Sequence, residues 1–120
     1  MKILLVGANG TVGQGVAAEL RARHEVISAG RRGADVILDL ADPASIRGAL
    51  EKLGPVDAIV SAAGEVGWAP LLDLTAEQWA FTVANKLMGQ VQLALIGHEY
   101  LRDEGSITLT SGVLVDQPVR

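Results

Sequence analysis

Three glycines near the amino terminus, spaced three residues apart, are the residues best suited to binding a ligand. Gly7, Gly10 and Gly13 follow a short apolar run, residues 3–6, and precede apolar residues at helical spacing. A helix that begins at such a turn points its unpaired N–H groups and the positive end of its dipole at the turn, where a phosphate group binds. The order strand, glycine turn, helix therefore predicts a nucleotide site, and the alternative is a glycine-rich turn without a ligand.

A separate physical requirement explains each glycine of this turn. The first permits a tight exit from the strand, the second lets the backbone approach a pyrophosphate, and the third lets the helix pack close to the sheet. Polar side chains between them add hydrogen bonds to phosphate or to the loop. The residues that we expect to face the nucleotide are Gly7, Asn9, Gly10, Thr11, Val12 and Gly13.

A pair of arginines follows the second predicted strand, residues 25–29. In dinucleotide sites an acidic residue there holds the ribose 2′-hydroxyl of NAD, whereas arginine accommodates the additional phosphate of NADP. Arg31 and Arg32 occupy this position, and no carboxylate precedes Asp35. Because a guanidinium donates two parallel, charge-assisted hydrogen bonds to phosphate, NADP (as NADPH) is the predicted cofactor and NAD is less favoured. The alternative is a solvated basic turn.

Strand and helix patterns alternate along the 120 residues, which predicts a single domain. The predicted strands are residues 3–6, 25–29, 34–38, 56–61 and 106–110, and the predicted helices follow the glycine turn and cover residues 43–53 and 75–101. This alternation implies right-handed crossovers and a Rossmann-type doubly wound α/β fold, with a five-stranded parallel sheet in the order 3-2-1-4-5. A nucleotide would lie across the carboxyl ends of these strands.

Composition and charge argue against several classes of function. The net charge is −4 without a basic block, so we expect no nucleic-acid partner, and no stretch is long enough to cross a membrane. The absence of cysteine excludes a disulfide and a cysteine metal site and fits a cytoplasmic location. His24 and His98 have no partners at metal-binding spacing, so no metal site is predicted.

The order and spacing of these landmarks resemble the short-chain dehydrogenase/reductase family over essentially the whole chain. Residues 61–64, Ser-Ala-Ala-Gly, are similar to the family's Asn-Asn-Ala-Gly segment, with both asparagines changed. Asp39 and Leu40 match an acidic–aliphatic pair that holds the adenine. The resemblance thus implies further cofactor contacts from Asp39, Leu40, Ala62, Ala63 and Gly64.

The catalytic residues of the family match only in part. They are a serine at the end of the fifth strand, a tyrosine about a dozen residues later, which is the general acid/base, and a lysine four residues further on. Ser111 matches the serine, unless the alignment slips by one residue onto Gly112. The sequence ends at Arg120, before the tyrosine and lysine, and Tyr100 lies before the fifth strand. The resemblance therefore implies that Ser111 contacts the substrate.

The family also carries an asparagine in the long helix, usually three residues before a glycine. Counting back from Gly89 leads to Lys86, with Asn85 one residue away. Lys86 either replaces the asparagine and reaches the nicotinamide ribose or a structural water, or is a solvated helix lysine. Trp68, in the loop before this helix, either lines a substrate pocket or covers the core.

Two functions are compatible with this pattern. The resemblance implies an NADP-dependent oxidoreductase that moves hydride to or from a small carbonyl or alcohol, with residues 1–120 as the amino-terminal, cofactor-binding part of a longer fold. The alternative, favoured by the missing tyrosine and lysine, is an NADP-binding sensor or scaffold without catalysis. The family also implies a homodimer or homo-oligomer formed through the long helix, residues 75–101.

Overall fold

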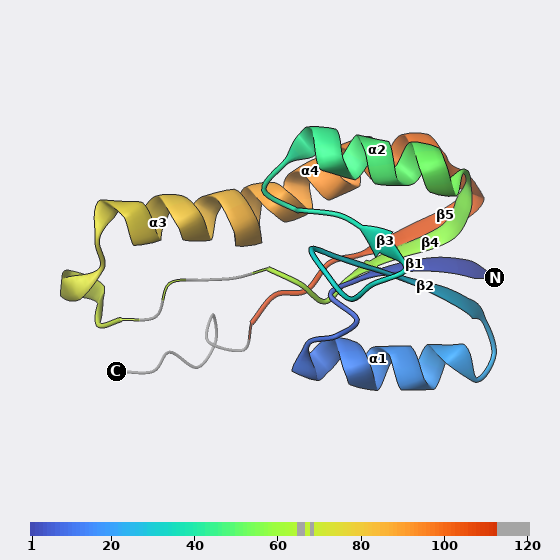
Figure 1. Cartoon of the computed structure of the whole chain (residues 1–120), viewed down its shortest axis with the longest axis horizontal. Coiled ribbons are helices and arrows are strands. Elements are labelled where there is room, and N and C mark those ends of the chain that lie inside the picture. The colour runs from blue at the N-terminus through green and yellow to red at the C-terminus, as the bar shows by residue number, and fades with distance from the viewer. Residues whose placement is uncertain (65–66, 68, 113–120) are drawn as a thin grey trace.

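A five-stranded, all-parallel sheet forms the centre of the molecule (Figure 1). The computed structural model describes residues 1–64, 67 and 69–112. The strands are β1 (Lys2–Val6), β2 (Glu25–Gly30), β3 (Val36–Ile37), β4 (Val56–Ser61) and β5 (Leu101–Thr108). They lie in the order β3-β2-β1-β4-β5, which confirms the predicted order 3-2-1-4-5 and the Rossmann-type fold.

Helices cover both faces of the sheet. Helix α1 (Thr11–Arg21) lies on one face, and α2 (Pro43–Leu53) and α4 (Met88–Gly97) lie on the other (Figure 1). Because alternate residues of a strand point to opposite faces, Leu4 of β1 joins the core under α2 and α4, whereas Leu5 joins the smaller core under α1. Burial on both faces explains why β1 is a continuous apolar run.

Local capping defines where two of the helices begin. Helix α2 starts with Pro43 after Asp42, whose carboxylate accepts a hydrogen bond from the Ala44 N–H at 3.1 Å. Helix α3 (Ala76–Thr82) begins with the predicted capping box, in which Thr75 and Gln78 each accept a hydrogen bond from the other's backbone N–H. Both predicted helix starts are therefore confirmed. The sequence could predict them because each cap involves only neighbouring residues.

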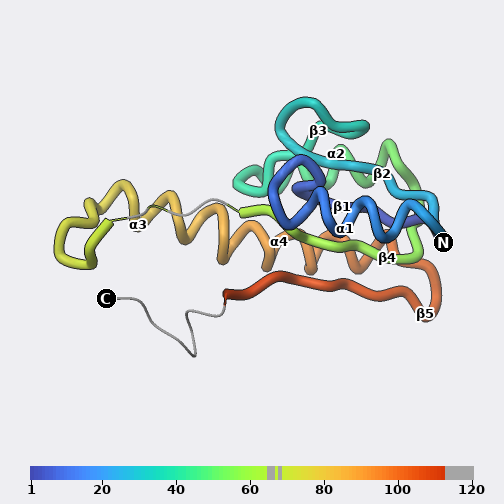
Figure 2. The backbone as a smooth tube through the Cα atoms, turned by 90° about the horizontal axis from the view of Figure 1, so that it is seen from below, coloured from blue at the N-terminus to red at the C-terminus, as the bar shows by residue number. Residues whose placement is uncertain are grey.

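The predicted helix over residues 75–101 is wrong in its continuity and its end. A π-helical segment, Val83–Leu87, separates α3 from α4. Helix α3 projects beyond the carboxyl edge of the sheet, whereas α4 lies on the sheet beside α2 (Figure 2). Helix α4 ends at Gly97, and a 3₁₀ turn, His98–Tyr100, leads directly into β5. Leu101 continues the helical spacing of apolar residues, but it pairs with Val56 of β4 and packs against the core.

Strands β3 and β5 are also shifted from their predicted limits of residues 34–38 and 106–110. Pairing of β3 with β2 starts at Val36, because Asp35 uses its carboxylate to accept from the Ser28 N–H. Strand β5 ends at Thr108, and the backbone of Thr110 pairs with a helix side chain instead of with β4.

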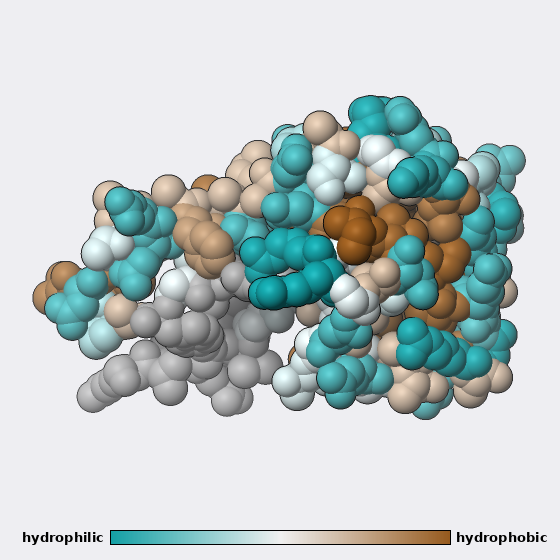
Figure 3. Space-filling model, in the orientation of Figure 1, coloured by the Kyte–Doolittle hydropathy of each residue, from teal (hydrophilic) through white to brown (hydrophobic). Residues whose placement is uncertain are grey.

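Strand β3 forms an open edge of the sheet. An apolar patch lies over this strand below α2, on the face shown in Figure 3. Ile37 is 60% exposed there.

None of the helices in the described parts of the chain is long and apolar enough to cross a membrane.

Candidate functional site

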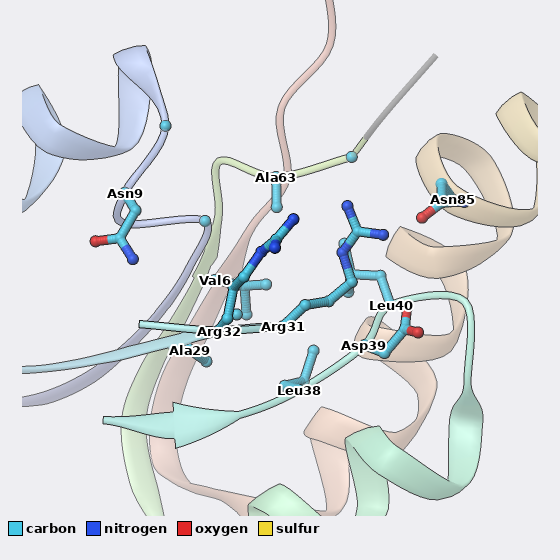
Figure 4. A pocket seen from close by; sticks show the side chains of 14 residues that line it. Val6, Asn9, Ala29, Arg31, Arg32, Leu38, Asp39, Leu40, Ala63 and Asn85 are labelled. Atoms are coloured by element: carbon cyan, nitrogen blue, oxygen red, sulfur yellow. The ribbon is translucent and has the colours of Figure 1, made fainter. Parts of the chain in front are cut away.

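A pocket of about 270 Å³ lies at the carboxyl edge of the sheet (Figure 4). Its walls come from the glycine turn after β1, the turn after β2, the segment after β3, the segment after β4 and the π-helical segment. Nine predicted cofactor residues line it: Gly7, Asn9, Gly10, Arg31, Arg32, Asp39, Leu40, Ala63 and Gly64. The other predicted residues, Thr11, Val12, Gly13 and Ala62, lie next to this lining in the chain.

The three glycines of the first turn have different structural roles. Gly7 has a φ of 86°, and a Cβ built on it would lie 2.6 Å from the Cβ of Ala63. A Cβ on Gly13 would collide with the carbonyl oxygen of Gly7, so this glycine allows α1 to pack against the turn. Gly10 differs, because the nearest atom to its added Cβ is the Gly7 oxygen at 3.5 Å. Gly7 and Gly13 thus serve packing, and Gly10 keeps the pocket wall free of a side chain.

The amino end of α1 is suited to an anion. Gly10 is the N-cap residue and provides no side-chain cap, and the described first turn of α1 carries no acidic residue. By contrast, α2 and α3 have their first N–H groups capped by Asp42 and Thr75. The first amides of α1 and the positive end of its dipole therefore stay available for a phosphate beside the pocket.

Arginine side chains from the β2–β3 turn form the opposite wall. Figure 4 shows Arg31 and Arg32 extending side by side into the space between the glycine turn and the π-helical segment. Among the described residues that line the pocket, Asp39 supplies the only carboxylate. One of its oxygens accepts from the Ala41 N–H at 2.9 Å, and its own N–H donates to the Ser45 hydroxyl at 2.9 Å. The charge of the pocket therefore favours an anionic ligand.

Lys86 lies beside the pocket and is anchored. Its ammonium group donates to the Thr110 hydroxyl at 3.0 Å and to the Ala63 carbonyl at 3.4 Å. Its aliphatic stem packs on Gly64, where an added Cβ would lie 2.6 Å from the Lys86 Cδ. Of the two interpretations of Lys86, the solvated helix lysine is wrong. Ser111 follows Thr110 and is exposed. The ammonium group of Lys86, from the π-helical segment, lies beside the residues that follow β4 and β5.

Gln90, one helical turn after Lys86, was not singled out from the sequence. Its amide N–H donates to the Thr110 carbonyl at 3.0 Å and to the Lys86 carbonyl at 3.1 Å, and its amide oxygen accepts from the Thr110 N–H at 2.9 Å. Gln90 thereby replaces the strand partner that the backbone of Thr110 lacks. The only signal in the sequence is the spacing of four residues from Lys86, which occurs in any helix.

Asn85, which the sequence offered only as an alternative to Lys86, also belongs to the site. It lines the pocket, is 8% exposed, and donates to the Phe81 carbonyl at 3.2 Å. A π-helical turn contains one residue more than an α-helical turn, which explains why counting back from Gly89 did not decide between Asn85 and Lys86. The structure directs Asn85 into the pocket and Lys86 onto Gly64. Trp68 lies outside the described residues.

Charged pairs at the opposite edge serve the scaffold. Asp57 accepts from the Lys2 N–H at 2.7 Å and from Arg102 at 2.9 Å, and these bonds hold the pKa of its carboxyl below the usual value. Glu99 pairs with Arg47 at 2.9 Å, which lowers the pKa of Glu99. Within the described residues, no group of acidic or histidine side chains is placed to hold a metal ion.

Comparison with known proteins identifies the family. A model of the NAD dependent epimerase/dehydratase family matches residues 3–96. The chain belongs to this family. Its resemblance to short-chain dehydrogenases is also confirmed, because small-chain dehydrogenases are among the similar solved structures. No curated protein matches the sequence.

Three solved structures resemble this member of the NAD dependent epimerase/dehydratase family closely. The protein lin1944 from Listeria innocua is 47% identical, with a TM-score of 0.96 over 98% of this chain and 59% of that protein. A small-chain dehydrogenase is 30% identical, with a TM-score of 0.88 over 99% of this chain and 60% of that one. Another, solved in complex with NADPH, is 28% identical, with a TM-score of 0.84 over 99% of this chain and 54% of that one. The chain thus spans between 54% and 60% of the length of these proteins.

Proposed function

We propose that the pocket binds NADP and that the chain is the cofactor-binding part of an oxidoreductase of the short-chain dehydrogenase/reductase type. Such an enzyme would move hydride to or from a small carbonyl or alcohol. One observation carries the proposal: the uncapped amino end of α1 and two arginine side chains border the same pocket. The small-chain dehydrogenase that was solved with NADPH supports the choice of cofactor.

The residues of the pocket suit the parts of a dinucleotide. The turn with Gly10 would hold the pyrophosphate, because it combines free amides with a wall that has no side chain. Arg31 and Arg32 would bind the 2′-phosphate, and Asp39 with Leu40 would border the adenine. Ala63 and Gly64, from the predicted segment 62–64, would border the nicotinamide half, next to Lys86.

When bound, NADPH supplies a hydride, and the chain's own residues orient the substrate. Ser111 would donate a hydrogen bond to the substrate oxygen, as the serine of the family does. Lys86 would place a positive charge beside the same region, held there by the Thr110 hydroxyl and the Ala63 carbonyl. Ser111 and Lys86 therefore remain the proposed catalytic residues.

A second function is an NADP-binding sensor or scaffold. The observation in its favour is the position of Tyr100, the single tyrosine of the sequence. Tyr100 directly precedes Leu101, which pairs with Val56 at the start of β4, so it lies at the edge opposite the pocket. It is therefore too remote to be the proton donor for this pocket.

The cofactor is tested by titrating NADPH and NADH and following the nicotinamide fluorescence. Arg31→Asp combined with Arg32→Ala is expected to weaken NADPH binding much more than NADH binding. Arg23→Asp combined with Arg47→Ala makes the same charge change outside the pocket and should leave both affinities unchanged. Equal loss for the two cofactors would refute the assignment of NADP.

Catalysis is tested by screening small carbonyl compounds with NADPH. Turnover that disappears in Ser111→Ala supports the oxidoreductase. Tight NADPH binding without turnover of any compound supports the sensor or scaffold.

An exposed apolar stripe along the helical stretch from α3 to α4 supports a homodimer. Apolar side chains recur every four residues along α3, the π-helical segment and α4, and they are between 37% and 64% exposed: Trp79, Val83, Leu87, Val91 and Leu95. Such a stripe favours burial against a second copy of the chain. Light scattering should give the dimer mass for the protein and the monomer mass for Leu87→Asp. A clean monomer before substitution would count against the proposal.

A further inference from the structure

The turn that presents the two arginines is tied down by a residue outside the pocket lining. We propose that Asp35 is a positioning residue for cofactor specificity: its carboxylate, bound to Ser28, holds the β2–β3 turn so that Arg31 and Arg32 face the 2′-phosphate. This inference rests on the proposed function, because it takes NADP as the ligand of the pocket.

Three hydrogen bonds join Asp35 to Ser28. The Asp35 carboxylate accepts from the Ser28 N–H and from the Ser28 hydroxyl, both at 2.9 Å, and the Asp35 N–H donates to the same hydroxyl at 3.0 Å. Ser28 belongs to β2 and is only 6% exposed, so the anchor is part of the rigid sheet. These bonds also lower the pKa of Asp35, so its carboxylate is ionised at neutral pH.

The same turn is anchored on its other side. The Asn9 amide donates to the Gly33 carbonyl at 2.9 Å, and the Gln14 amide donates to the Asn9 carbonyl at 3.0 Å. Gly33 has a φ of 65°, which allows the chain to reverse at this point. The arginines therefore lie between two fixed points, the glycine turn on one side and β2 on the other.

Anchoring matters because arginine is long and flexible. An unanchored turn would have to become ordered when the phosphate binds, and that loss of freedom would weaken affinity. NADH has no 2′-phosphate and gains little from ordered arginines, so the effect should fall on NADPH.

If Asp35 acted only through its negative charge, its substitution would have the opposite effect on NADPH binding. Asp35 is three residues from Arg32, and removing its negative charge should strengthen phosphate binding. Loss of the anchor should weaken it. Asp35→Ala removes both the charge and the acceptor, whereas Asp35→Asn removes the charge and keeps an acceptor oxygen. Ser28→Ala removes the two hydrogen bonds of the hydroxyl, keeps the one from the backbone N–H, and changes no charge.

The experiment measures the Kd of NADPH and of NADH for each variant by fluorescence titration, with circular dichroism to check folding. Asp35→Ala and Ser28→Ala should each lower the preference for NADPH by about threefold to tenfold. Asp35→Asn should retain more of the preference than Asp35→Ala. Asp103→Ala, which removes an exposed carboxylate on β5, is the matched control and should change neither Kd.

The outcomes separate this inference from the proposed function. If the unsubstituted protein does not prefer NADPH, the proposed cofactor is wrong and the inference falls with it. If the protein prefers NADPH but Ser28→Ala and Asp35→Ala keep the full preference, only the positioning role is refuted. An increased preference in both Asp35 variants would mean that Asp35 acts through its charge alone and would also refute that role.

Discussion

The contact between Gln90 and Thr110 leads to the most specific prediction for this molecule. Gln90 makes two hydrogen bonds to the backbone of Thr110, one from its amide N–H at 3.0 Å and one to its amide oxygen at 2.9 Å. Thr110 in turn accepts from Lys86 through its hydroxyl. Substituting Gln90→Leu keeps a side chain of similar size and removes both backbone contacts. The end of β5 should then lose its position, and with it the partner of Lys86.

The magnitude follows from the bonds that are lost. Three hydrogen bonds, two to Thr110 and one to the Lys86 carbonyl, contribute a net stabilisation of about 0.7–1 kcal/mol each. The free energy of unfolding should therefore fall by about 2–3 kcal/mol. Because the entropy of unfolding is about 2.1 cal/mol/K per residue, this loss in 120 residues lowers Tm by about 8–12 °C.

Urea unfolding and calorimetry measure the global effect, and amide hydrogen exchange of Thr110 measures the local one. Gln92→Leu makes the same substitution two residues along α4, where Gln92 borders a separate groove, and serves as the control. NADPH affinity should change less than about twofold, since neither Gln90 nor Thr110 lines the pocket. Equal stability of the two variants, or unchanged exchange at Thr110, would refute the reasoning.

Four further predictions test the pocket, the β2–β3 turn and the core. Gly10→Val should weaken NADPH binding about tenfold or more in a fluorescence titration, because the new side chain enters the pocket. Gly10 has an extended backbone, with φ −75° and ψ 171°, so the free energy of unfolding should stay within about 1 kcal/mol of that of the unsubstituted protein. Gly13→Ala should instead lower the unfolding free energy by about 1–3 kcal/mol in urea, because the Cβ meets the Gly7 carbonyl. Asp35 has a pKa below its unfolded value of 3.8, so its stabilisation should be complete above that pH and disappear as the pH falls through the lower folded value; comparing acid unfolding of the protein and Asp35→Ala measures this, and identical profiles would contradict it. Leu50→Ala should cost about 2–5 kcal/mol in urea, because Leu50 is fully buried, and a loss below 1 kcal/mol would contradict the assigned core.

Much of the fold was predictable because its determinants are local. The glycine turn between β1 and α1 needs only the glycines and the apolar patterns beside them. Caps such as Asp42 and Thr75 act on residues within three positions. The strand order follows from the alternation of strands with helices and the handedness of their connections, which holds for nearly all parallel sheets.

The errors have a physical cause as well. Leu101 continues the spacing of the helix and also fits the start of a strand, so the end of α4 depended on its pairing with Val56. The π-helical segment shifts the helix by one residue, which no pattern of apolar residues reveals. For the same reason, the sequence suggested Lys86 and Asn85 as alternatives, and the structure uses both.

The sequence by itself determined the glycine turn, the two arginines beyond β2 and the parallel sheet whose carboxyl edge brings them together, because each depends on residue type and local spacing. Only the tertiary structure decided how that edge is held in place. Asp35 reaches Ser28, and Gln90 reaches Thr110, across elements that become neighbours only when the sheet and helices pack. A hydrogen bond between such residues depends on distance in space, and the order of residues along the chain does not specify that distance.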